Sequence, residues 1–252
     1  MLVAAAVCPC PPLLIPEVAA GAAPEMDAAR AACSDAIAVL AASRPDRLVV
    51  VGPAGAGDGG THAQGARGSF RGFGVDLDVR LGETLADAVG APEGEDAPEG
   101  EQDAAGELPV SLAVAGWLLE RTRWAAAPLE GVGVAESLAA ERCVQVGEEI
   151  AARAERVALL VMGDASACRT LKAPGYLDER AAGFDEAVAR ALAAADIEAL
   201  KELDVDLAGQ LKAAGRAPWQ VLAGAAGGAG LGGRLLFDDA PYGVGYLVAT
   251  WS

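Results

Sequence analysis

The sequence predicts an α/β fold: a central, mostly parallel sheet with helices on both faces. Short apolar runs recur along the chain, and segments with helical periodicity separate most of them. Runs that are apolar throughout are typical of parallel strands covered on both faces. Hydrophobic residues make up 53% of the 252 residues but aromatic residues only 4%, so we expect a large core built from alanine, valine and leucine.

The first third of the chain opens with an apolar run at residues 2–7, which predicts a buried strand. A proline-rich loop, 8–16, follows it. A helix is predicted over 24–42. Pro24 is compatible with it, because proline is tolerated in the first turn of a helix. The next apolar run predicts a strand at 47–51, which leads into a loop rich in glycine and alanine at 52–60.

The middle of the chain contains an acidic segment. Before it, partial alternation of apolar residues over 70–79 predicts a hairpin arm. Residues 91–107 (APEGEDAPEGEQDAAGE) have almost no apolar bulk and a strong negative charge, which predicts a disordered surface insertion. We expect one domain over residues 1–252 that contains this insertion.

In the second half of the chain, predicted helices alternate with predicted strands. Helices are predicted at 110–121 and 137–154, and strands at 131–135 and 157–162. Asp178 is a plausible N-cap for a helix whose apolar residues recur every four positions, at 184, 188 and 192. Shorter helices are expected at 203–214 and 218–226, with a glycine-rich connection at 224–233. The last apolar run predicts a strand at 243–250.

Charge and cysteine content exclude several classes of protein. The net charge of −17 argues against binding to nucleic acid or to an anionic membrane surface, since both need a basic footprint. The apolar start has no basic residues and soon meets prolines, so it does not have the form of a signal peptide or a membrane span. Five cysteines, an odd number, do not indicate a disulfide framework. We expect a cytoplasmic protein.

In an α/β sheet the ligand crevice lies beyond the carboxyl ends of the strands. The loops at 9–12, 52–60, 163–169 and 238–242 are therefore the candidate site loops. They overlap four sequence segments that occur in a distinctive order: CPCPPLLIPE at 8–17, VVVGPAG at 49–55, LVMGDASA at 160–167 and DDAPYGVGY at 238–246.

These segments resemble the class III extradiol dioxygenase B-subunit (LigB-like) superfamily over nearly the whole chain. In that family a histidine precedes the first Pro-Pro, a second strand ends in Ser-Pro-His-Gly, a third is followed by Gly-Asp-x-Ser-His, and a glutamate precedes the final Ala-Pro or Gly-Pro. The resemblance implies the same α/β fold. It also implies dimers or a small companion subunit, as in many members.

Members that cleave catechol-type rings hold non-haem Fe(II) with two histidines and one carboxylate, and a further histidine handles protons. Carried over by the resemblance, the two histidine ligands fall on Cys10 and Ala54, and the carboxylate falls on Asp239. The proton-handling position falls on Ala167. Only Asp239 keeps the required chemistry, since alanine has no donor atom and cannot move a proton.

His62 is the one histidine in the chain, so a site that needs two cannot form within one copy. The sequence therefore predicts a divergent relative without the iron site, without ring cleavage and with no cofactor, which keeps a roomier and less polar crevice. Its expected partner is a small molecule or another protein. A homo-oligomer or a companion subunit is also compatible with the resemblance.

The alternative is a metal-dependent, dioxygenase-like oxidoreductase with Fe(II) or Zn(II) in a non-standard site. Sulfur, nitrogen and oxygen donors for it would come from Cys10 and Asp239, together with His62 or Cys168. Against this, His62 lies in a glycine-rich stretch and is expected to be a solvated loop residue. Asp164 and Ser166, which follow a predicted strand, are expected to tie their loop.

Overall fold

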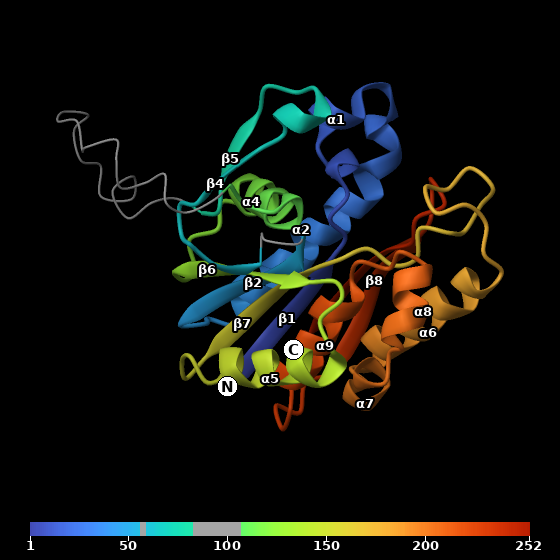
Figure 1. Ribbon diagram of the computed structural model, residues 1–252. Coiled ribbons are helices and arrows are strands. Elements are labelled where there is room, and N and C mark those ends of the chain that lie inside the picture. Colours follow the sequence, from blue (N-terminus) through green and yellow to red (C-terminus); the bar gives the residue numbers. More distant parts are fainter. Residues whose placement is uncertain (56–58, 83–106) are drawn as a thin grey trace, which may run out of the picture.

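The computed structural model describes residues 1–55, 59–82 and 107–252. A seven-stranded sheet with the order β3-β6-β2-β7-β1-β9-β8 forms the centre of the molecule (Figure 1). Its central strands β6, β2, β7 and β1 are parallel, and β9 runs antiparallel to β1. The predicted α/β class, with a mostly parallel sheet, is confirmed.

The strands of this sheet have the following bounds: β1 Leu2–Cys8, β2 Arg47–Ala54, β3 Gly60–Ala63, β6 Leu129–Ala135, β7 Val157–Met162, β8 Gly233–Asp239 and β9 Tyr246–Trp251. A separate two-stranded ribbon consists of β4 (Arg67–Ser69) and β5 (Asp78–Arg80). The strand predicted at 157–162 is confirmed at both ends. The hairpin arm expected over 70–79 exists, but its strands flank most of that segment instead of filling it.

The described helices are α1 Pro16–Ala19, α2 Asp27–Ala42, α4 Val110–Arg121, α5 Ala140–Ala151, α6 Arg180–Ala194, α7 Ile197–Lys201, α8 Val205–Gln210 and α9 Arg216–Ala225. The described residues also form 3₁₀ helices at Pro12–Leu14, Ala20–Met26 and Arg71–Phe73. Helices α2 and α4 cover one face of the sheet, and α5, α6 and α9 cover the other (Figure 1). The prediction of helices on both faces is confirmed.

Each face of the sheet has its own core. Along β1, Ala4, Ala6 and Cys8 point to the α2 and α4 side, while Ala5 and Val7 point to the α5, α6 and α9 side. This alternation is the period of two that a strand imposes. It explains why β1 is apolar at every position.

Two edge strands differ from the predictions. β8 lies where the sequence predicts the end of a glycine-rich connection and the start of a loop at 238–242, and β3 begins in the predicted loop at 52–60. Both lie at the edges of the sheet and are partly exposed, so neither needs a continuous apolar run. The acidic segment 91–107 lies outside the described residues, except for Glu107.

Helices α5 and α9 pack at very short range through two glycines. A Cβ atom on Gly147 would overlap the carbonyl oxygen of Val221 and lie 2.6 Å from the amide nitrogen of Ala225. A Cβ atom on Gly224 would overlap the carbonyl oxygen of Val144 in the same way. These glycines are required because the two helix backbones touch.

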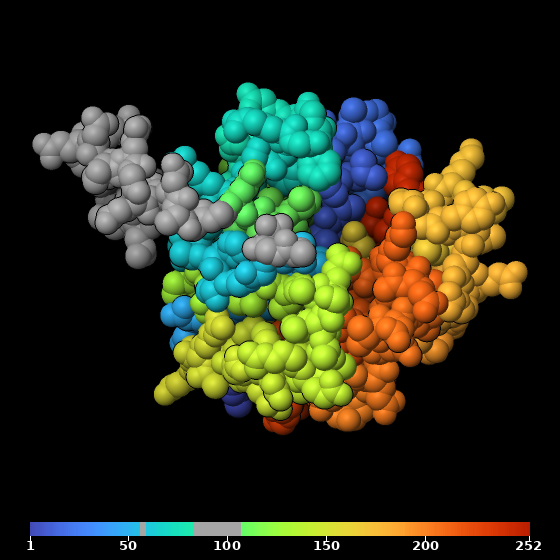
Figure 2. All heavy atoms as spheres, in the orientation of Figure 1, coloured from blue at the N-terminus to red at the C-terminus, as the bar shows by residue number. Residues whose placement is uncertain are grey.

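The loop between β7 and α6 projects from the body of the molecule, in the golden region of Figure 2. Leu171 and Tyr176 on this loop are 61% and 63% exposed. Among the described residues, no helix has the length and apolar character needed to cross a membrane.

Candidate functional site

The carboxyl ends of β2, β7 and β1 lie next to one another, and three of the four positions singled out by the family resemblance follow these strands. Ala54 ends β2, Ala167 lies in the loop after β7, and Cys10 lies just after β1. These strand ends form one edge of the sheet, where Asp164 after β7 accepts a hydrogen bond from Cys10 after β1. Ala167 lies farther along the loop, where its amide donates to the carbonyl oxygen of Leu211 at 2.9 Å. We refer to this region as the carboxyl edge.

Neighbouring atoms cover all three positions. Cys10 is 7% exposed, Ala54 6% and Ala167 9%. Three cavities of about 400, 770 and 560 Å³ occur elsewhere, and none has any of these residues in its lining. None of these three cavities is the roomier crevice expected from the sequence. Because Cys10, Ala54 and Ala167 offer little exposed surface, a ligand at this end of the sheet would lie on the loops around the partly exposed Asp164.

Asp239 lies farther away, at the end of β8. Two strand spacings, about 10 Å, separate β8 from β1. The Asp239 side chain is exposed, and its Oδ1 accepts a hydrogen bond of 2.7 Å from the neighbouring amide of Ala240. Its carboxylate is thus engaged locally.

The expectation that His62 is a solvated loop residue is wrong. It lies in β3, paired with Gly131 of β6, and is 9% exposed. Its Nε2 atom has no hydrogen-bond partner among the described residues. β3 and β8 are the two opposite edges of the sheet, about 25–30 Å apart, so His62 and Asp239 cannot hold the same ion.

Cys168 lies on the other side of the sheet from Cys10. It is 1% exposed in the core formed with α5, α6 and α9, and its thiol donates to the carbonyl oxygen of Leu211 at 3.4 Å. Cys10 belongs to the core formed with α2 and α4. Within residues 1–55, 59–82 and 107–252, no group of three or more His, Cys, Asp or Glu side chains could hold a metal ion. The proposed non-standard ligand set is therefore not brought together.

Asp164 is the polar centre of the carboxyl edge. Its Oδ1 atom accepts a hydrogen bond of 2.8 Å from the amide of Cys10, and its carbonyl oxygen accepts one of 2.9 Å from the amide of Gly215. Asp164 thus connects the loops that follow β1 and β7 to the start of α9. The prediction that it ties its loop is confirmed, and its side chain remains partly exposed.

The groups around Asp164 favour their uncharged forms. Burial raises the pKa of Asp164 to about 7, and the negative charge of Glu136 adds to this, while the Cys10 amide opposes it. Burial also raises the pKa of the Cys10 thiol, with Asp164 and Glu136 contributing. The pKa of the Tyr246 phenol is raised by burial and then by Asp164. Near neutral pH the edge therefore presents a thiol, a phenol and a partly protonated carboxyl.

A buried carboxylate on α6 holds the loop that carries Asp164. Asp185 of α6 is 2% exposed and accepts hydrogen bonds from the amide and the hydroxyl of Ser166, at 2.8 and 2.9 Å. Arg169 forms an ion pair with it at 3.0 Å. Asp185 is not among the residues predicted from the sequence. A signal is present, because it falls between Ala181 and Ala189 at helical spacing, on the buried face of α6.

Comparisons with known proteins agree with the fold. No protein-family model and no curated protein sequence matches the chain. The crystal structure of an uncharacterized protein, JW3007, from Escherichia coli K12 is similar to this chain, with 16% sequence identity and a TM-score of 0.54. The match covers 99% of this chain and 100% of that chain. At this identity the similarity shows the fold alone.

The raised pKa of Asp164 gives a pH dependence of stability. Its pKa is about 7 in the folded protein, above the ordinary value of 3.8, so the unfolded chain releases this proton first as the pH rises. The free energy of unfolding should therefore fall as the pH rises from about 4 to about 7. The upper limit of this fall is about 4 kcal/mol, and solvent screening of the partly exposed Asp164 reduces it. Asp164→Asn should remove this fall, so urea unfolding should show the variant to be the more stable protein at pH 8.

Asp178 provides a control of opposite sign. Hydrogen bonds from Arg180 lower the pKa of Asp178 to about 2, so its carboxylate contributes stability above the ordinary pKa. Asp178→Asn should therefore lower stability at pH 8. If wild type and Asp164→Asn lost the same free energy of unfolding as the pH rises, the pKa of Asp164 would not be raised in the folded protein.

Proposed function

We propose that this protein is a divergent relative of the LigB-like dioxygenases, without their iron site, and that it binds a small uncharged or cationic molecule at the carboxyl edge. The observation that carries the proposal is the placement of Cys10 and Ala54 at the ends of β1 and β2, on either side of β7, whose following loop carries Ala167. These are the positions where the resemblance implies two iron ligands and a proton-handling histidine. Methyl groups now stand at two of them.

The remaining donors support binding without metal. Burial favours the neutral thiol of Cys10, whereas the thiolate is the form that binds metals. His62 and Asp239 lie at opposite edges of the sheet. The resident Fe(II) of a ring-cleaving enzyme therefore does not fit the side chains of this chain.

The electrostatics of the edge favour the stated class of ligand. Asp164 and Glu136 provide carboxyl groups, while the buried guanidinium of Arg216 turns inward. It donates to the carbonyl oxygens of Glu136 and Leu138 and to the side chain of Gln220. An anion would meet carboxyl groups without a compensating cation. A neutral or cationic molecule could instead exchange hydrogen bonds with the Asp164 carboxyl, which both donates and accepts near pH 7.

The proposal is tested by metal analysis and ligand-observed NMR on the same preparation. After anaerobic exposure to Fe(II) or Zn(II) and desalting, we expect no stoichiometric metal. A set of neutral, cationic and anionic fragments should give hits among the first two classes. Asp164→Asn should weaken the cationic hits by about tenfold, because it removes the charge of one strong hydrogen bond while it keeps a donor and an acceptor for the neutral hits.

Two controls keep the result interpretable. Asp178→Asn removes a partly exposed carboxylate that is paired with Arg180 and should leave the hits unchanged. Stoichiometric iron or zinc that is lost in the Cys10→Ala, Asp239→Ala double variant would instead establish a metal site. Cationic hits that are insensitive to Asp164→Asn, or a preference for anions, would contradict the proposed ligand class.

A further inference from the structure

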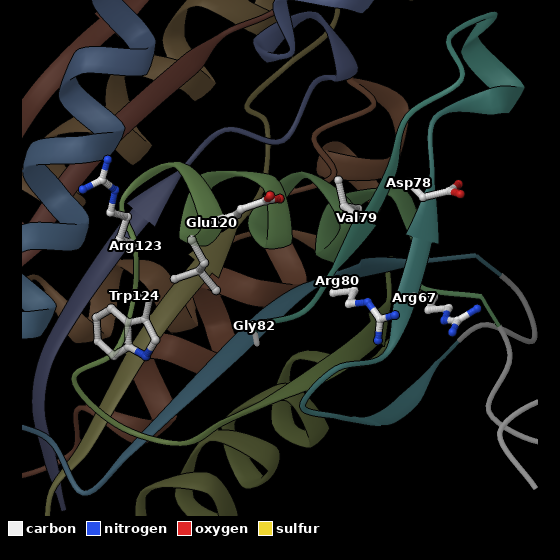
Figure 3. A pocket seen from close by; sticks show the side chains of 9 residues that line it. Arg67, Asp78, Val79, Arg80, Gly82, Glu120, Arg123 and Trp124 are labelled. Atoms are coloured by element: carbon white, nitrogen blue, oxygen red, sulfur yellow. The ribbon is translucent and has the colours of Figure 1, made fainter. Parts of the chain in front are cut away.

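A cavity of about 400 Å³ lies between the β4–β5 ribbon and the C-terminal end of α4. Figure 3 shows the side chains that line it. It is close to the start of β6, since a Cβ atom on the lining residue Gly82 would lie 2.7 Å from the side chain of Leu129. It therefore lies at the opposite end of the parallel strands from the carboxyl edge.

Two arginines stand directly opposite each other on one wall of this cavity. Arg67 of β4 and Arg80 of β5 are register partners, and their side chains extend side by side in Figure 3. Among the described residues, neither guanidinium forms an ion pair or a side-chain hydrogen bond. Like charges directly opposite on paired strands destabilise the pair, so this arrangement would be relieved by an anion.

The acidic residues of the lining do not neutralise these arginines. The carboxylate of Asp78 forms an ion pair of 2.6 Å with Arg71, which lies outside the lining. Glu120 is the remaining acid among the lining residues, and Arg123 adds a third guanidinium. The cavity thus has a positive balance, although the whole chain has a net charge of −17.

The other end of the cavity presents an aromatic ring, with Arg123 and Glu120 beside it (Figure 3). Trp124 lies across from the arginine pair, and its indole Nε1 donates to the carbonyl oxygen of Ala127 at 2.8 Å, which fixes the ring. Val79 and Leu119, which are 3% and 1% exposed, add apolar surface to the lining. A planar ring system can lie against such a surface.

We propose that this cavity binds a phosphate monoester with a flat, apolar body. Two adjacent guanidinium groups match a doubly charged head group, because their planar donors pair well with phosphate oxygens. Trp124 and Leu119 would contact the body of the ligand. The cavity volume is in the range of about 300–1,000 Å³ that is usual for sites of small organic ligands.

The test is a calorimetric titration of the full chain with three probes: 1-naphthyl phosphate, inorganic phosphate and 1-naphthol. We expect 1-naphthyl phosphate to bind at least about tenfold more tightly than either of the other two, since each lacks one half of the interaction. Equal affinity for inorganic phosphate and the ester would overturn the proposal. So would a failure of the ester to bind.

A charge-matched pair of variants separates the site from general electrostatics. Arg67→Gln, Arg80→Gln should weaken binding of the ester by at least about tenfold. Arg142→Gln, Arg190→Gln changes the net charge equally at exposed arginines of α5 and α6 and should leave the affinity unchanged. Equal losses in the two double variants would overturn the proposal. All four substituted arginines are exposed, so both proteins should fold like wild type.

NMR of the indole groups locates the bound ester. The ¹⁵N–¹H resonance of Trp124, assigned by its loss in Trp124→Phe, should shift on addition of 1-naphthyl phosphate. Trp219 and Trp251, which are 0% and 1% exposed in the core, should not shift. Binding that leaves the Trp124 resonance unchanged would place the ester elsewhere and overturn the assignment.

Discussion

Replacing Asp185 by alanine is expected to lower the free energy of unfolding by about 3–5 kcal/mol. The substitution removes the acceptor of two hydrogen bonds that Ser166 donates. Because Ser166 is 0% exposed, water cannot replace this acceptor. It also leaves Arg169 without its partner. Chemical unfolding at pH 7 measures the loss.

The neighbouring residue provides the matched control. Glu186 lies on the same helix, is exposed, and forms an i,i+4 ion pair with Arg190. Glu186→Ala should change stability by only about 0.5 kcal/mol, as is usual for exposed pairs. Hydrogen exchange should also show faster exchange of the Ser166 amide in Asp185→Ala but not in Glu186→Ala. Equal stabilities of the two variants would mean that Asp185 does not hold the loop of Asp164.

Gly147→Ala should destabilise the protein by about 3 kcal/mol or more, which is at the upper end of typical overpacking effects. The added methyl group would overlap the backbone of α9, which cannot rotate away as a side chain can. Helices α5 and α9 would have to separate along their contact. Thermal or urea unfolding of the purified variant measures the effect.

Gly183→Ala makes the same chemical change where there is room. Gly183 lies inside α6, is exposed, and has no atom within 4 Å of the position that the added methyl group would take. Alanine is the better helix former by about 1 kcal/mol, so this variant should be slightly more stable than wild type. A similar destabilisation by both substitutions would show that the α5–α9 contact tolerates a methyl group.

The central strands could be predicted from the sequence because both of their faces are covered. β7 is apolar at all its positions, and its predicted bounds are correct. β3 and β8 could not be recognised in the same way, since each exposes part of its surface and contains polar residues. The misplacement of His62 has this cause: a glycine-rich edge strand looks like a loop.

The candidate site was predictable only in part. The rule that loops follow the carboxyl ends of parallel strands brought Cys10, Ala54 and Asp164 to one edge. The rule does not give the order of strands in the sheet, and that order separates His62 from Asp239. The order depends on long-range crossovers that no local pattern encodes.

The position of β1 has a consequence for how the chain acquires its structure. Its two neighbours in the sheet are β7 and β9, so β1 pairs with residues 157–162 on one side and 249–251 on the other. During synthesis β1 emerges well before β7 and β9, and it has neither neighbour until they follow. Such distant pairings slow folding, and an apolar strand with two open sides is prone to aggregation in the meantime. Refolding yield should therefore depend strongly on protein concentration and on the presence of chaperones.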